Sequence, residues 1–128
     1  MNNVIIESTK STPRVLLDFE KNNFIIEGQS YPENASEFYS PITKSIDSYI
    51  KESNNPFVLN LKIYYLNTSS TMCFMNLFDK LEEAYKRKKS NITINWIYDE
   101  KNEVSLECGE EFKEDFTFPF NIIKDENK

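Results

Sequence analysis

The second half of the chain alternates between strand-like and helix-like segments, and this alternation limits the fold more than any other feature of the sequence. Residues 57–65 alternate apolar and mixed side chains and are rich in β-branched and aromatic types, which is typical of a strand. Directly downstream, Phe74, Phe78, Leu81 and Tyr85 recur at helical spacing. Strands that alternate with helices in this way indicate a parallel sheet.

The same periodicities along the whole chain predict the order β-β-β-α-β-α-β-α-β. The predicted strands cover residues 3–7, 14–19, 24–27, 57–65, 92–98 and 116–123, and the predicted helices cover residues 35–50, 70–88 and 103–114. This order implies right-handed crossovers and a mainly parallel sheet after an antiparallel opening. We therefore predict an α/β fold, with a mixed sheet and helices packed on it. Residues 1–128 are expected to form one domain with a polar, frayed tail at 124–128.

Three places are ambiguous or irregular. Pro41 interrupts the first predicted helix, which is either kinked there or begins with Ser40 as its cap. The segment 103–114 has a helical apolar face and an acidic stripe, but Gly109 weakens a helix, and part of the segment alternates like a strand. Pro119 places the last strand at an edge or a bulge of the sheet.

The composition excludes several classes of function. The chain has no His, so the usual serine or cysteine triads and His-containing metal sites are not available. It has only two glycines, which excludes glycine-rich phosphate loops, and its net charge of −6 disfavours nucleic-acid binding. An enzyme would need unrecognised carboxylate or lysine chemistry, so we expect no catalytic residue, no metal and no cofactor.

The remaining single features have ordinary structural explanations. No apolar run approaches the length of a membrane span and no signal pattern opens the chain, so we expect a cytoplasmic protein without a membrane partner. Cys73 and Cys108 are expected to be buried thiols, and Trp96 is expected in the core. The basic run 86–89 is explained as a solvated helix end that complements the helix dipole.

Four polar residues, Asn67, Thr68, Ser69 and Ser70, lie where a predicted strand ends and a predicted helix begins. Backbone N–H groups at a helix start lack internal partners, and Asn, Ser and Thr are the residues that cap them. The same N–H groups and the helix dipole also favour a phosphate. The residue types at this joint alone favour a plain cap.

Three longer motifs and several shorter ones carry a resemblance across nearly the whole chain. The longer motifs are Gly28-x-Ser30-Tyr31-Pro32-Glu33-Asn34-Ala35, Phe38-Tyr39-x-Pro41-Ile42 and Tyr65-x-Asn67-Thr68-Ser69-Ser70. The shorter ones are Trp96-x-Tyr98, Gly109-Glu110-Glu111-Phe112 and Pro119-Phe120. With these motifs the chain resembles the SiaC family of bacterial biofilm-regulation phosphoproteins. It departs from the family at Thr71-Met72, where a small residue followed by a basic one is expected.

The resemblance implies a STAS-like fold, as in anti-sigma-factor antagonists, and a phosphorylation switch. Thr68 is implied as the residue that a Ser/Thr kinase with a histidine-kinase-like ATPase fold phosphorylates, and a metal-dependent Ser/Thr phosphatase is implied to remove the phosphate. The unphosphorylated form is implied to bind and activate a diguanylate cyclase, which raises cyclic di-GMP and favours biofilm. The alternative is a scaffold of the same fold that is not phosphorylated, or a regulator of the anti-sigma-factor-antagonist type.

A switch at Thr68 requires its hydroxyl to be exposed at the start of the second helix, beside an apolar patch that partners contact. We expect this patch to include part of the first helix or the loop at Tyr31. The residues predicted to contact partners are Tyr31, Asn67, Ser69, Ser70, Thr71, Met72 and Met75. Asn34 or Ser30 is expected to cap the first helix.

Overall fold

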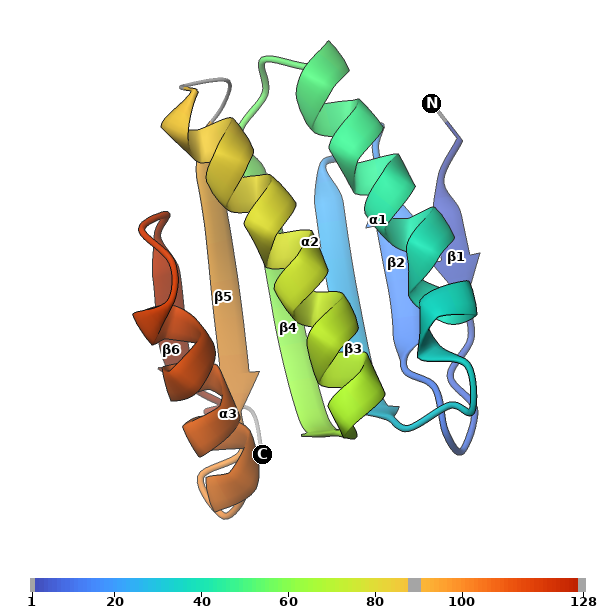
Figure 1. The fold of residues 1–128 in the computed structure, drawn as a ribbon, viewed down its shortest axis with the longest axis vertical. Coiled ribbons are helices and arrows are strands. Elements are labelled where there is room, and N and C mark those ends of the chain that lie inside the picture. The colour runs from blue at the N-terminus through green and yellow to red at the C-terminus, as the bar shows by residue number, and fades with distance from the viewer. Residues whose placement is uncertain (1, 88–90, 127–128) are drawn as a thin grey trace.

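The computed structural model describes residues 2–87 and 91–126 and contains one sheet with three helices (Figure 1). The strands are β1 (Val4–Ile6), β2 (Arg14–Asp18), β3 (Asn23–Ser30), β4 (Phe57–Leu66), β5 (Ile92–Tyr98) and β6 (Phe120–Lys124). The helices are α1 (Ala35–Glu52), α2 (Thr68–Lys86) and α3 (Glu103–Glu114). The predicted order of elements is confirmed, and so is the helical alternative for 103–114.

The strands lie in the sheet in the same order as in the sequence, β1-β2-β3-β4-β5-β6. The first two pairings are antiparallel and the following three are parallel, so the predicted mixed sheet is confirmed. Each parallel connection leads to the next strand on the same side of the previous one. Because such crossovers have the same handedness, they place their helices on the same face of the sheet. Figure 1 shows all three helices in front of the sheet, which gives a two-layer molecule.

The hydrophobic core lies between the sheet and this helical layer. Along β4, the buried residues Phe57, Leu59, Leu61 and Ile63 alternate with residues that face away from the helices. Trp96 on β5 has no exposed surface, which confirms its predicted place in the core. Because no helix covers the other face of the sheet, that face is open in the described part of the chain.

A row of asparagine side chains crosses this open face on the three C-terminal strands. Asn95 pairs in register with Asn60 on one side and with Asn121 on the other. Its Nδ2 donates to Oδ1 of Asn60 at 3.0 Å, and Nδ2 of Asn121 donates to Oδ1 of Asn95 at 3.0 Å. The ladder continues the backbone pairing of these strands through their side chains.

Several predicted boundaries were wrong. Strand β3 continues through Ser30, past its predicted end at residue 27, because Gly28 adopts a φ of +136° and a register shift after it lets the pairing with β4 continue. Helix α1 starts with Asn34 as its cap, as one alternative predicted, and runs through Pro41, so Ser40 is not a cap. Helix α2 begins at Thr68 rather than at residue 70, and its predicted end at 88 lies outside the described residues.

The first residues of the segment 124–128, which was predicted to be a frayed tail, have defined contacts in the structure. Strand β6 runs to Lys124, at the edge of the sheet that Pro119 predicted, but it starts at Phe120 rather than at 116. The next residue, Asp125, donates its N–H to Tyr98 and forms an ion pair of 2.6 Å with Nζ of Lys62. None of the helices, within the residues described, is both long and apolar enough to cross a membrane.

Candidate functional site

Two parallel strands and two helices meet at the joint between β4 and α2. Ser30, the last residue of β3, pairs with Leu66, the last residue of β4, because the carboxyl ends of parallel strands meet at one edge of the sheet. The N–H of Asn67 donates to the carbonyl of Ser30 at 2.9 Å. Thr68 follows as the first residue of α2, and the chain leaves β3 toward the start of α1 (Figure 1).

Asn67 is the cap of α2. Its Oδ1 accepts the N–H of Ser70 at 2.9 Å, and its carbonyl accepts both the N–H of Thr71 at 2.9 Å and the hydroxyl of Thr71 at 3.0 Å. Asn67 and Thr71 are therefore used locally in the helix start, although both keep part of their surface exposed. Whether they also contact a partner stays a prediction.

Thr68 is exposed at this helix start, as predicted. The first turn of α2 has no acidic residue, whereas the first turns of α1 and α3 contain Glu37 and Glu103. Acidic groups are stabilising near a helix N-terminus, because free N–H groups and the helix dipole give it a partial positive charge. A negative group on Thr68 would supply at α2 the charge that the other two helices already have.

Ser70 is different from its neighbours, because it is fully buried and its hydroxyl points into the protein. Its Oγ lies 2.7 Å from Oγ of Ser30, which also accepts the hydroxyl of Tyr39 at 2.7 Å. Burial raises the pKa of the Tyr39 hydroxyl far above its usual range, despite the hydrogen bond with Ser30, so Tyr39 stays protonated and donates. The prediction that Ser70 contacts a partner was therefore wrong, since it has no accessible surface.

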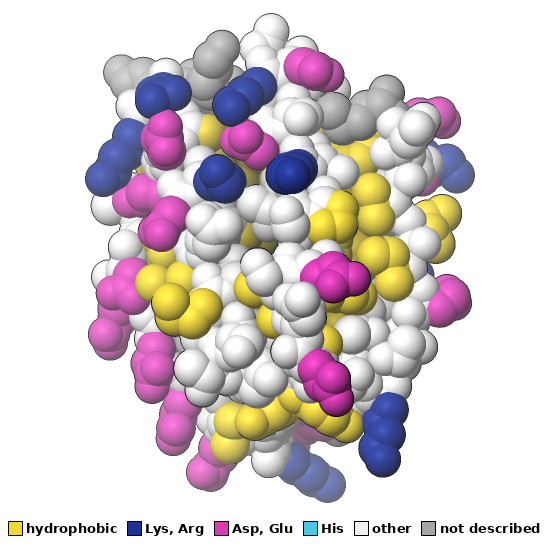
Figure 2. Space-filling view, turned by 45° about the vertical axis from the view of Figure 1, so that its right-hand side comes forward, with side chains coloured by type: hydrophobic (Ala, Val, Ile, Leu, Met, Phe, Trp, Pro, Cys, Tyr) yellow, Lys and Arg dark blue, Asp and Glu magenta, His cyan; other side chains and the backbone are white. Residues whose placement is uncertain are grey.

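Exposed apolar side chains surround the joint, as expected for the loop at Tyr31. Met72 on α2 is 65% exposed, Tyr65 on β4 is 46% exposed and Tyr31 is 37% exposed. The rings of Tyr31 and Tyr65 contact each other with centroids 6.4 Å apart. Figure 2 shows hydrophobic side chains in a band at the lower end of the molecule, where α1 and α2 begin. We call Tyr31, Tyr65, Thr68, Ser69 and Met72 the Thr68 surface.

The helices leave a hollow of about 410 Å³ beside the Thr68 surface. Ser69, Met72 and Cys73 of α2 line one side of it, and residues 33–36 at the start of α1 line the other. Met75, by contrast, is half-buried and packs against the core. Of the predicted contacts on α2, Ser69 and Met72 are therefore exposed, while Thr71 and Met75 offer only part of their side chains.

The described residues contain no metal-binding cluster of three or more His, Cys, Asp or Glu side chains. The two thiols, predicted to be buried, are only partly buried. Burial raises the pKa of Cys73, and burial together with Glu111 raises the pKa of Cys108 to about 11. Since the thiolate is the reactive form, both thiols are poor nucleophiles near neutral pH.

Comparison with known proteins identifies the family of this chain. The sequence profile described as "SiaC family regulatory phosphoprotein" matches residues 6–125. The chain belongs to the SiaC family. Its role is therefore regulatory rather than catalytic. It is 36% identical over 122 residues to an uncharacterised protein of Pseudomonas aeruginosa strain UCBPP-PA14, a match that covers 95% of this chain and 96% of that protein.

Solved structures of SiaC family members have the same fold. SiaC of Pseudomonas aeruginosa superposes with a TM-score of 0.90 at 34% identity, covering 98% of this chain and 100% of that chain. Another match is to the crystal structure of the diguanylate cyclase SiaD in complex with its activator SiaC from Pseudomonas aeruginosa. The matched chain of that complex has a TM-score of 0.89 at 35% identity and covers 95% of this chain and 99% of that chain.

Sequence reasoning missed Ser30 and Tyr39 as parts of this site. Ser30 was considered as a cap and Tyr39 only as part of a motif, yet together they support Ser70 at the base of α2. The signal was indirect, because both residues belong to the motifs that carry the family resemblance. Periodicity alone cannot find a contact between residues 30 and 70, which are far apart in the sequence.

Proposed function

We propose that this chain is a non-catalytic cytoplasmic phosphoprotein whose unphosphorylated form binds and activates a diguanylate cyclase. The observation that carries the proposal is the exposed Thr68 in the first turn of α2, beside exposed apolar side chains. Support comes also from the SiaC of Pseudomonas aeruginosa, which occurs in a complex with the cyclase that it activates. Thr68 is the proposed acceptor, and Tyr31, Ser69 and Met72 are the proposed contacts that remain accessible.

A phosphate on Thr68 acts through charge. It adds about −1.5 to −2 charges and three strong acceptor oxygens at neutral pH. The N-terminus of α2 tolerates this charge well, because it has no acidic residue of its own. A partner that packs closely on the Thr68 surface, or presents carboxylates to it, must instead desolvate or repel the phosphate. The modification therefore weakens partner binding without disturbing the helix.

Two enzymes complete the proposed switch. The family resemblance suggests a Ser/Thr kinase with a histidine-kinase-like ATPase fold and a metal-dependent Ser/Thr phosphatase. Within the motif Asn67-Thr68-Ser69-Ser70, exposure leaves Thr68 and Ser69 as acceptors, because Ser70 has no accessible surface. Incubation of the chain with its cognate kinase and ATP, followed by mass spectrometry, identifies the site. We expect phosphate on Thr68, its loss in Thr68→Ala and its retention in Ser69→Ala; phosphate on Ser69 alone would contradict the assignment.

Calorimetric titration with the cyclase then tests the consequence for binding. Thr68→Ala should bind within about threefold of the unmodified chain, while Thr68→Glu should bind roughly tenfold or more weakly, which corresponds to about 1.4 kcal/mol. The matched control is Ser48→Glu, which adds the same charge at an exposed position of α1 outside the Thr68 surface and should bind as the unmodified chain does. Equal binding by all four proteins, together with no phosphate on the chain, would favour the unphosphorylated scaffold.

A further inference from the structure

A groove runs along the line where α1 and α2 lie side by side, and it consists of three hollows that share lining residues. The hollow beside the Thr68 surface shares Ser36, Cys73 and Asn76 with a second hollow of about 240 Å³. The second shares Asp47 and Lys80 with a third of about 140 Å³, near the ends of both helices. We call this continuous depression the α1–α2 groove.

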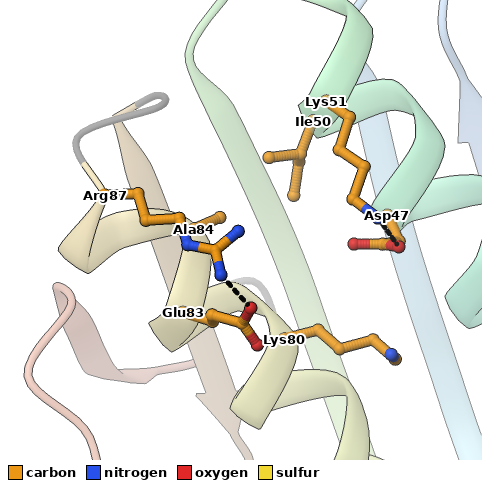
Figure 3. A pocket seen from close by; sticks show the side chains of 7 residues that line it. All are labelled: Asp47, Ile50, Lys51, Lys80, Glu83, Ala84 and Arg87. Carbon is orange, nitrogen blue, oxygen red and sulfur yellow. Dashed lines mark ion pairs between the residues drawn. The ribbon is translucent and has the colours of Figure 1, made fainter.

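The groove is cationic toward the ends of the two helices. Lys44, Lys51, Lys80 and Arg87 line this half, against the two carboxylates of Asp47 and Glu83. Figure 3 shows two internal ion pairs there, Lys51 with Asp47 at 3.0 Å and Arg87 with Glu83 at 2.8 Å. Both carboxylates are thereby neutralised, each on its own helix.

Two lysines remain available for a ligand. Lys44 and Lys80 are exposed and form no ion pair within the described part of the chain. Figure 3 shows the side chain of Lys80 extended from α2 across the groove, toward the α1 side. This excess of positive charge contrasts with the net charge of −6 of the whole chain. Negative charge on a partner is therefore attracted to this groove and repelled by most of the remaining surface.

We propose that the α1–α2 groove is a docking surface for an acidic amphipathic helix of a partner protein. Apolar contact along the groove comes from the exposed Met72 and the half-buried Cys73 near the Thr68 surface and from the half-buried Ala84 at the far end, while Ala35 and Ile50 form parts of its floor with little exposed surface. Met72 and Ala84 are twelve residues apart on one helix, which corresponds to about 18 Å or three helical turns. An amphipathic helix places apolar side chains every three to four residues along such a groove. Acidic residues beside that stripe meet Lys44 and Lys80.

The far half of this docking surface adds a contact that does not depend on the state of Thr68. Lys80 lies twelve residues after Thr68 in α2, at a separation of about 18 Å along the helix. This exceeds the Debye length of about 8 Å at physiological salt, so a phosphate on Thr68 has little effect on the charge near Lys80. A partner helix therefore stays attracted to the far end of the groove when the Thr68 surface is phosphorylated.

The test uses two stapled helical peptides of 16 residues, which differ only in charge. Both carry leucines at positions i, i+4, i+7 and i+11, and one has six flanking glutamates where the other has six lysines. Titration of the isotopically labelled full chain is followed by its amide NMR shifts at about 50 mM salt. The glutamate peptide is expected to shift amides of α1 and α2 along the groove, although the overall charge of the chain would favour the lysine peptide.

Charge reversal supplies the decisive comparison. The double variant Lys44→Glu/Lys80→Glu should bind the glutamate peptide at least about fivefold more weakly and should gain groove shifts with the lysine peptide. Lys101→Glu/Lys113→Glu, which reverses two exposed lysines outside the groove, is the matched control and should leave binding unchanged. No groove shifts at 1 mM glutamate peptide, or shifts insensitive to the double variant, would overturn the proposal. Because no cyclase is used, this result is independent of the proposed function.

Discussion

Gly109 is needed for the packing of Trp96. A Cβ added to Gly109 would lie 2.4 Å from Cδ1 and 2.6 Å from Nε1 of the indole. The ring has little freedom to move away, because Trp96 is fully buried and its Nε1 donates to the carbonyl of Ser105 at 2.9 Å. The glycine that weakens the helical pattern in the sequence thus allows α3 to approach the sheet closely.

Gly109→Ala should lower the free energy of unfolding by about 1–3 kcal/mol, because the added methyl group overpacks the core. The higher helix propensity of alanine, worth about 1 kcal/mol, acts in the opposite direction. Urea unfolding followed by tryptophan fluorescence measures the difference. The exposed neighbour variant Glu110→Ala should stay within about 0.5 kcal/mol of the original chain. A Gly109→Ala protein of unchanged stability would mean that the indole can shift.

The buried hydroxyls of Tyr39, Ser30 and Ser70 form one network, so their contributions should not be additive. Tyr39→Phe removes the hydroxyl that donates to Ser30, and we expect a loss of about 0.5–1.5 kcal/mol. Ser70→Ala removes the other partner of Ser30. Urea unfolding of both single variants and of the double variant gives the coupling energy. A double variant equal to the sum of the two would contradict a shared network.

Each helix begins with an asparagine cap, and two of these caps differ in how they use the side-chain amide. Within the described residues the side chain of Asn67 uses only Oδ1, whereas that of Asn102 accepts the N–H of Ser105 and also donates its Nδ2 to the carbonyl of Tyr64 at 3.0 Å. Asparagine and aspartate cap helices equally well, but aspartate has no amide donor. The same substitution, asparagine to aspartate, is therefore expected to change the stability differently at the two positions.

Asn67→Asp should keep the cap and gain up to about 1 kcal/mol, because it adds a negative charge at the start of α2. Asn102→Asp should instead lose about 1 kcal/mol, because the carbonyl of Tyr64 loses its donor. Both alanine variants should be destabilised by about 0.5–2 kcal/mol through loss of the cap. Thermal and urea unfolding at neutral pH measure all four. Equal stability of the two aspartate variants would show that the bond to Tyr64 contributes nothing.

Glu82 of α2 holds the segment between α3 and β6. Its Oε1 accepts the N–H of Thr117 at 2.9 Å and the N–H of Phe118 at 3.2 Å, and its Oε2 accepts the hydroxyl of Thr117 at 2.9 Å. Burial opposes ionisation, but these hydrogen bonds and Lys86 prevail and hold the pKa of Glu82 below its usual range. The ionised carboxylate is therefore stabilised in the folded state.

This lowered pKa predicts a pH-dependent contribution to stability. A carboxyl whose pKa is lower when folded stabilises the protein fully above its unfolded value of 4.5, and loses this effect as the pH falls through the folded value. Glu82→Gln should therefore be less stable than the original chain at pH 7, and the gap should narrow below about pH 4.5. Urea unfolding between pH 7 and pH 3.5 tests this, and a constant gap would contradict it. Glu110→Gln is the exposed control at pH 7, expected within about 0.5 kcal/mol.

Phosphorylation of Thr68 is expected to leave the fold unchanged. Thr68 lies at the surface, and the side-chain hydrogen bonds of Asn67 and Ser70 that fix the start of α2 do not involve the Thr68 side chain. A negative charge at this helix start should stabilise the chain by about 0.3–1 kcal/mol. Amide NMR shifts of Thr68→Glu should change only near the helix start, and its thermal midpoint should not fall. Shift changes on β6 or α3 would contradict a local switch.

The sequence predicts the elements well because each one carries its own periodic pattern. The alternation in β4 and the helical spacing from Phe74 to Tyr85 are patterns within single elements, and the folded chain forms the element that each pattern predicts. The continuation of β3 past Gly28 was missed, because glycine is typical of loops as well as of bulges. The burial of Ser70 was missed for a different reason: its partner is forty residues away, and a serine gives no sign of the partner it will have.

The order of the strands has a consequence for how the protein is made. In this sheet every strand lies next to its neighbours in the sequence. A polypeptide leaving the ribosome N-terminus first can therefore add each new strand to an edge that already exists. No strand has to be inserted between two earlier ones, and no early edge waits for a distant segment. The joint at Thr68 is complete once α2 has emerged, and the residues still to be synthesised extend the sheet away from it.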